Sequence, residues 1–163
     1  MRQSSLITII VFLAGLGIGY FARSAGVGVP GKTDSHAADM AAIEKLHRAD
    51  VAATLAQDSS AMTNLWSDNG VNLGFPGAPV GLKAIGEAYA KMKVDYPDFK
   101  VLKYESNIKD VQILDGWAIE VGDVAATYQM SPQSAPVNVN DTGMRLLKRQ
   151  SDGSWKFALV GLK

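Results

Sequence analysis

Three ionisable side chains in the sequence could carry acid–base chemistry, and two of them are neighbours on one helix face. His47 and Asp50 lie three residues apart in a segment whose apolar residues have helical spacing. A carboxylate beside an imidazole favours the imidazolium, which is a common arrangement for a general acid or base. The alternative is an ion pair on the helix surface, where such pairs add little stability.

Glu120 is the third candidate. It has the strand parity of Ala118 and Gly122, so we expect these side chains on one face of a strand. If that face lies opposite Asp50, the two carboxyl groups could share a proton and act as an acid. The alternative is that Glu120 bonds a Lys or Tyr, because structural networks also perturb carboxylates.

Composition excludes several kinds of chemistry. The 163-residue chain has no cysteine, which removes thiol catalysis, disulfides and cysteine-based zinc sites. Its two histidines, His36 and His47, have no ligand spacing, so no metal or cofactor is predicted. The formal charge is zero, with 16 basic and 16 acidic residues and no basic stretch, so no nucleic-acid partner is expected.

The N-terminal residues indicate export. Residues 6–22 are uncharged and follow Arg2, so residues 1–22 are predicted to be a signal peptide or a signal anchor. The run is longer than most signal-peptide cores and slightly shorter than the roughly 20 residues that span a bilayer, so both interpretations stay open. We expect the remaining chain outside the cytoplasm, in the cell envelope or periplasm or secreted, touching the membrane only through residues 6–22.

The elements that must position the three ionisable groups follow from pattern and punctuation. Gly, Pro and small polar residues predict a flexible tether at 23–37, before one domain at 38–163. Helical spacing predicts helices at 38–57, 60–66 and 82–94, and the polar residues at 67–70 end the second of them. A brief strand is predicted at 71–75.

Two hairpins account for the rest of the chain. Asp115-Gly116 joins strands at 101–114 and 117–130, and Asp152-Gly153 lies in the turn between strands at 142–149 and 155–162. Lys148 and Arg149 are expected at the solvated end of the second hairpin. Helices followed by long antiparallel strands predict an α+β domain with three N-terminal helices packed on a strongly curved antiparallel sheet.

Both faces of the last strand are apolar and should be buried against other parts of the structure. Trp155, Phe157 and Leu159 alternate with Ala158, Val160 and Leu162. An antiparallel strand that is apolar on both sides packs on two partners. We expect the helices on one face and a second subunit on the other, which predicts a homodimer.

Several spaced motifs resemble the SnoaL-like, nuclear-transport-factor-2-like superfamily. They are Leu55-Ala56-Gln57-Asp58, Leu65-Trp66-Ser67-Asp68-Asn69-Gly70-Val71, Gly81-Leu82-Lys83-Ala84-Ile85 with Tyr89, Asp115-Gly116-Trp117-Ala118-Ile119-Glu120-Val121-Gly122 and Asp152-Gly153-Ser154-Trp155-Lys156. The last two look like the branch grouped as a domain of unknown function related to ketosteroid isomerase. The resemblance covers residues 38–163. It implies a cone-shaped barrel, usually homodimeric, with a pocket between the first helix and the concave sheet.

Departures from the superfamily argue against steroid isomerisation. Ketosteroid isomerase has an oxyanion-hole tyrosine on its first helix, where this sequence has Asp50, and a general-base aspartate where Phe75 stands. A phenyl ring cannot take a proton. The resemblance also implies that the face of Glu120 points towards the helices, where Gly122 would let a helix approach closely.

Two functions remain open, because members of the superfamily include isomerases, cyclases, dehydratases, ligand carriers and assembling domains. The first is a pocket for a small apolar or amphipathic molecule, with His47, Asp50 and Glu120 orienting it or moving a proton in an unassigned isomerase, cyclase or hydrolase type of reaction. The second is a non-catalytic homodimerising module at the cell envelope. Some side chains are candidates for lining the pocket, although aromatic and Met residues more often form core: Thr54, Trp66, Phe75, Tyr89, Tyr104, Tyr128 and Met144.

Overall fold

The computed structural model describes residues 33–75 and 77–162. The helices are α2 (Thr33–Ala56), α3 (Ser59–Asn64) and α4 (Leu82–Asp95), and the strands are β1 (Trp66–Asn72), β2 (Lys100–Leu114), β3 (Trp117–Gln129), β4 (Val137–Arg149) and β5 (Trp155–Leu162). The predicted signal peptide or anchor, residues 1–22, lies outside the described residues. None of the described helices is long and apolar enough to cross a membrane.

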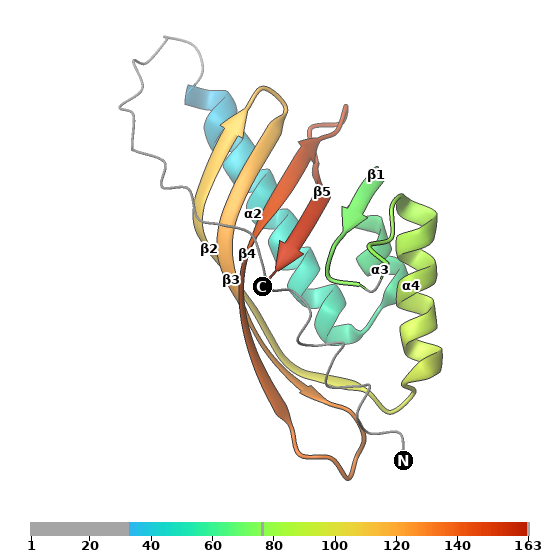
Figure 1. Cartoon of the computed structure of the whole chain (residues 1–163). Helices are drawn as coiled ribbons and strands as arrows, with labels where there is room; N and C mark the ends of the chain where they lie inside the picture. Colours follow the sequence, from blue (N-terminus) through green and yellow to red (C-terminus); the bar gives the residue numbers. More distant parts are fainter. Residues whose placement is uncertain (1–32, 76, 163) are drawn as a thin grey trace.

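The first described helix is longer than predicted. α2 begins at Thr33 rather than Ala38, so the end of the predicted tether is helical. The helix-breaking residues that indicate a tether stop at Gly31, and the residues between it and Ala38 are compatible with a helix. α2 lies along one face of the sheet, and α3 and α4 lie beside β1 (Figure 1).

A single five-stranded sheet in the order β1-β5-β4-β3-β2 carries the helices on one face (Figure 1). Strands β2 to β5 pair antiparallel in sequence order, and β1 pairs parallel with β5. Asp115 (φ 35°) and Gly116 (φ 83°) both have positive φ, as a type I′ turn requires, which confirms the first predicted hairpin. Within the described residues β1 and β2 are the two edge strands, with an isolated bridge from Val71 of β1 to Val80, so the predicted cone is an open curved sheet rather than a closed barrel.

The segment after α3, which the sequence predicts to end a helix and form a turn, is a β-strand. The predicted helix at 60–66 stops at Asn64, and β1 occupies Trp66–Asn72 in place of the strand predicted at 71–75. β1 pairs with β5 at Trp66 and Phe157, and an irregularity in the register before Val71 accommodates the polar residues between them. The turn signal in the sequence is therefore overridden by pairing with a strand from the other end of the chain.

A bulge in β5 changes which residues face the helices. The register passes from Phe157 to Leu159 and leaves Ala158 unpaired. Trp155 and Phe157 are buried, and beyond the bulge it is Val160 that packs against the core. The predicted strict alternation along this strand is wrong after Phe157, because one extra residue reverses the parity.

The hydrophobic core contains residues from α2 at the start of the described chain and from β5 at its end. The buried apolar residues of the core are Ile43, Leu46, Trp66, Ile85, Ala118, Leu147, Trp155 and Phe157. At its edge, the carboxylate of Asp39 forms an ion pair with Arg149 and accepts a hydrogen bond from Nε1 of Trp155 at 3.2 Å. Arg149 therefore contacts α2, and its side chain is 38% exposed, in agreement with its predicted place at the solvated end of the hairpin.

Gly122 permits a close approach between two strands. A Cβ at this position would lie 2.5 Å from the carbonyl oxygen of Asn107 and 3.1 Å from Cα of Ile108. Both contacts are with β2, whose register shifts between Ile108 and Asp110. Gly122 thus makes room for the backbone of a neighbouring strand and not for the helix that the resemblance implies.

Candidate functional site

His47 and Glu120 form a buried pair between α2 and β3. Nε2 of His47 lies 2.5 Å from Oε1 of Glu120. Glu120 is fully buried and His47 is 9% exposed, so the interpretation of His47 as a surface ion-pair residue is wrong. Nδ1 of His47 and Oε2 of Glu120 have no hydrogen-bond partner among the described residues. The carboxylate orients the imidazole through one nitrogen and leaves the other uncommitted, as a general base requires.

Asp50 bonds to a tyrosine of β2. The hydroxyl of Tyr104 donates a hydrogen bond to Oδ2 of Asp50 at 3.1 Å. Burial raises the pKa of the Asp50 carboxyl, and the positive charge of Arg145 acts in the opposite direction. Burial, followed by the charge of Asp50, raises the pKa of Tyr104, so its phenol stays protonated. His47, Asp50 and Glu120 therefore belong to two separate hydrogen-bonded pairs.

Arg145 joins this group from β4. It is 3% exposed, and its Nη2 donates a hydrogen bond to Oγ of Ser106 at 3.1 Å. The register places Arg145 beside Glu120 on the same face of the sheet. The sequence predicts its neighbour Met144 as a pocket residue, but Met144 is 51% exposed and lies on the opposite face. The signal that identifies Arg145 is its strand parity with the buried Leu147.

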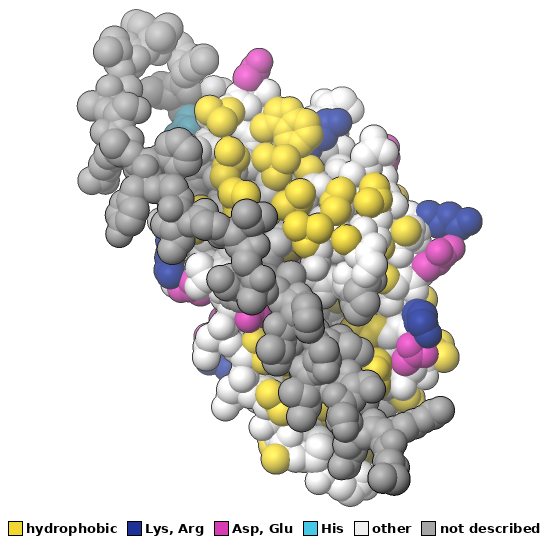
Figure 2. Space-filling model, viewed as in Figure 1, with side chains coloured by type: hydrophobic (Ala, Val, Ile, Leu, Met, Phe, Trp, Pro, Cys, Tyr) yellow, Lys and Arg dark blue, Asp and Glu magenta, His cyan; other side chains and the backbone are white. Residues whose placement is uncertain are grey.

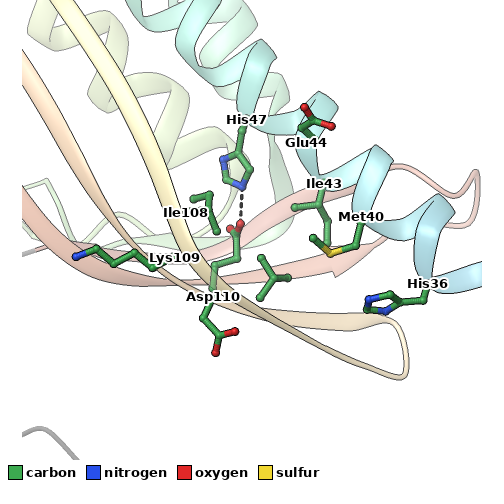
Figure 3. Close-up of a pocket in the computed structure, with 10 residues that line it drawn as sticks. His36, Met40, Ile43, Glu44, His47, Ile108, Lys109 and Asp110 are labelled. Carbon is green, nitrogen blue, oxygen red and sulfur yellow. Dashed lines mark hydrogen bonds and ion pairs between the residues drawn. The ribbon is translucent and has the colours of Figure 1, made fainter. Parts of the chain in front are cut away.

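A pocket of about 390 Å³ reaches the His47–Glu120 pair from the side of β2 (Figure 3). Ile43 and Met40 from α2 and Ile108 from β2 supply apolar walls, and the dashed line in Figure 3 marks the bond made by His47. The full lining is His36, Met40, Ile43, Glu44, His47, Ile108, Lys109, Asp110, Val111 and Glu120. The seven side chains predicted to line a pocket are not among these residues.

Several of those predicted residues instead lie in the electrostatic surroundings of Asp50. Burial raises the pKa of Tyr89 to about 12, and its ring packs edge-on against Phe75 with centroids 5.1 Å apart. Burial also raises the pKa of Tyr128, with the charges of Asp141 and Asp50 adding to the shift. These tyrosines keep their protons and can only donate or accept hydrogen bonds as phenols.

The remaining predicted residues have structural contacts. The hydroxyl of Thr54 lies 4.0 Å from Sδ of Met62. Trp66 is 3% exposed and packs on Phe157, so it belongs to the core and is not a pocket residue. Within residues 33–75 and 77–162, no group of three His, Asp or Glu side chains is arranged to hold a metal ion.

No protein-family model matches the sequence, and no curated protein matches it. Solved structures do match. A ketosteroid isomerase-like protein from Erwinia carotovora atroseptica SCRI1043 is similar over 76% of this chain and 94% of its own, with a TM-score of 0.63 and 24% identity. A protein from Novosphingobium aromaticivorans DSM 12444, provisionally named a scytalone dehydratase, is similar over 80% and 87%, with a TM-score of 0.67 and 16% identity.

A third similar structure is Aln2 from a Streptomyces species, with a TM-score of 0.60 and 11% identity over 85% of this chain and 93% of that one. The chain has the SnoaL-like, nuclear-transport-factor-2-like fold. This confirms the resemblance found in the sequence motifs.

Proposed function

We propose that this domain binds a small apolar or amphipathic molecule under α2, where His47, Glu120 and Asp50 orient the ligand or move a proton. The supporting observation is a buried imidazole–carboxylate pair in the wall of a pocket of about 390 Å³ with apolar sides. Pockets of this size with few polar groups bind small molecules.

His47 is the group best suited to proton transfer. Glu120 forms a hydrogen bond with Nε2 of His47, so the imidazole has a fixed orientation. Nδ1 of His47 makes no hydrogen bond among the described residues. Asp50 supplies a carboxyl group whose raised pKa favours the protonated form that can act as an acid. Isomerisation, cyclisation and hydrolysis all use a proton transfer of this kind.

Binding can be tested with 2-naphthol, a fluorescent amphipathic probe. We expect a saturable fluorescence change with one site per chain. Ile108→Trp should abolish it, because Ile108 lines the pocket and a larger side chain would fill the space under α2. Leu102→Trp adds the same ring at a residue of β2 that is 48% exposed, and should leave binding unchanged. Absence of saturable binding, or equal binding by both variants, would contradict the proposed function.

The proposal places this domain outside the cytoplasm. Its support is the uncharged run at 6–22 after Arg2. Alkaline phosphatase fused after Lys163 should be active, because the enzyme folds only after export, and deletion of residues 1–22 should remove that activity. A fusion that is inactive with and without residues 1–22 would contradict export.

The alternative function is a non-catalytic homodimer, and the outer face of the sheet favours it. Trp117, Val121 and Met144 are 39%, 42% and 51% exposed on the face turned away from the helices, where hydrophobic side chains gather in Figure 2. Val121 and Met144 are cross-strand partners, so the apolar surface is continuous. A two-fold axis would let the same patch on two copies meet itself and become buried.

Dimerisation can be tested by light scattering from the full chain in mild detergent. We expect twice the chain mass, and the chain mass for Val121→Lys. Val94→Lys is the matched control, since Val94 is 78% exposed on α4, away from the sheet face, and it should remain dimeric. A single-chain mass for the unchanged protein would exclude the homodimer.

A further inference from the structure

We propose that Arg145 is a positioning residue for proton transfer at His47, because its fixed positive charge balances Glu120 and keeps the imidazole in the neutral form that accepts a proton. This inference rests on the proposed function and adds the control of protonation at the same site. Arg145 is not among the residues that line the pocket under α2. It therefore acts on a bound molecule only through the residues beside it.

Arg145 and Glu120 are direct cross-strand partners on the face of the sheet that α2 covers. The register pairs the two residues, and Arg145 is 3% and Glu120 0% exposed. The side chains of such partners begin about 5 Å apart. Nη2 of Arg145 donates a hydrogen bond to Oγ of Ser106 on β2 at 3.1 Å, so the side chain crosses β3, the strand of Glu120. A guanidinium keeps its charge in proteins, and a buried charge acts strongly on its neighbours.

The charges of this buried group add to zero only in particular protonation states. Its members are His47 and Asp50 from α2, Glu120 from β3 and Arg145 from β4. An ionised Glu120 cancels the charge of Arg145, which leaves the two residues of α2 neutral. Burial raises the pKa of the Asp50 carboxyl, in agreement with a neutral acid at this position. A net charge away from water is costly, so the neutral total is favoured.

This charge balance determines the form of His47. With Glu120 ionised, the imidazole proton is on Nε2, which lies 2.5 Å from Oε1 of the carboxylate. Nδ1 then carries a lone pair, and it has no partner among the described residues. A neutral imidazole in this tautomer accepts a proton at Nδ1, as a general base must.

The other groups around His47 leave this balance to Arg145. Glu44 on α2 and Lys109 on β2 form ion pairs with residues outside the pocket, at 2.8 Å and 2.5 Å. From β5, the uncharged ring of Phe157 packs on His47 with centroids 6.0 Å apart. Exposed charges are screened by water and salt. The two other ionisable residues of the pocket lining are exposed: His36 and Asp110.

Nitrogen-15 NMR of the full chain in mild detergent tests this inference, because the imidazole shifts report both protonation and tautomer. His47→Gln assigns the signals. At pH 7 we expect a neutral His47 with its proton on Nε2. In Arg145→Met the pair should hold one more proton, seen as an imidazolium or as a neutral ring with its proton on Nδ1, with a proton affinity raised by about tenfold or more. Arg145→Lys keeps a cation and should restore the form found in the unchanged chain.

Arg48→Met is the matched control, since it removes from α2 a guanidinium whose side chain is 63% exposed, and it should leave His47 unchanged. An imidazolium in the unchanged chain at pH 7, or the same His47 signals in that chain and in Arg145→Met, overturns the role of Arg145. The first measurement needs no variant, so the test holds if Arg145→Met fails to fold. Neither result alters the binding of 2-naphthol, whose absence overturns the proposed function instead.

Discussion

Nε2 of His47 in α2 lies 2.5 Å from Oε1 of Glu120 in β3, across 73 positions of the sequence. Because Glu120 is fully buried, its carboxylate depends on this imidazole for a hydrogen bond. The same contact ties α2 to β3. The pair is therefore both a structural link and the candidate for proton transfer.

Removing one partner of this pair should lower the stability of the folded domain. His47→Ala leaves Glu120 buried without its partner, and we expect the free energy of unfolding to fall by about 3–5 kcal/mol in urea denaturation. The double variant His47→Leu with Glu120→Leu replaces the pair by apolar side chains and should be more stable than His47→Ala. A double variant that is less stable than His47→Ala would show that the polar pair itself is needed.

The link between Asp39 and the last hairpin should contribute measurably to stability. Asp39→Ala removes the ion pair with Arg149 and leaves Nε1 of Trp155 without an acceptor, so we expect a loss of about 2 kcal/mol. Glu44→Ala is the control, since Glu44 forms an exposed pair with Arg48 on the same helix and should cost about 0.5 kcal/mol or less. Equal losses would mean that burial of Asp39 has no effect.

Adding one methyl group at Gly122 should disturb the bend of β2. Gly122→Ala would place Cβ 2.5 Å from the carbonyl oxygen of Asn107, and we expect a loss of about 1–3 kcal/mol in thermal or urea unfolding. At Gly161 the added Cβ would lie 3.5 Å from Cδ1 of Leu73, an ordinary contact. Gly161→Ala should therefore be tolerated, and similar losses at both positions would contradict the packing argument.

The ionisation of Asp50 should make stability depend on pH. Its folded pKa is raised above 3.8, so between the two pKa values the folded chain holds more protons and stability falls as pH rises. Asp50→Asn keeps an acceptor for Tyr104 and cannot ionise. We expect the variant to be more stable than the parent at neutral pH, with the difference disappearing below pH 3.8.

Asp123 provides a control of opposite sign. Hydrogen bonds from Lys109 and Thr142 lower its pKa in the folded chain, so its contribution is present above its unfolded pKa and is lost as pH falls through its folded pKa. Asp123→Asn should be less stable than the parent at neutral pH. Urea denaturation across the pH range measures both variants, and the same sign for both would contradict this account.

Local signals predict most of the fold. Asp115-Gly116 determines one turn, and periodicity locates α4 and the long strands. The errors arise where distant pairing decides the structure. β1 forms because β5 pairs with it, and the bulge at Ala158 depends on how β4 and β5 align. Neither alignment is encoded in the residues of one strand alone.

The sequence predicts only part of the candidate site, because contacts between distant segments decide the rest. His47, Asp50 and Glu120 are all near one another, but their partners are set by the depth of α2 over the sheet. The sequence favours Met144 over Arg145 as an inward residue, because apolar residues usually face the interior. The strand has the opposite parity, with Arg145 buried and Met144 exposed.

The open sheet described above leaves β2 as a long edge strand, which in principle can recruit further strands and start fibril formation. Lys103, Glu105 and Lys109 place exposed charges along β2, and its register shifts twice, which spoils the flat template that another strand would need. Additional chains are therefore repelled from this border, and any contact between copies is directed to the broad surface of the sheet.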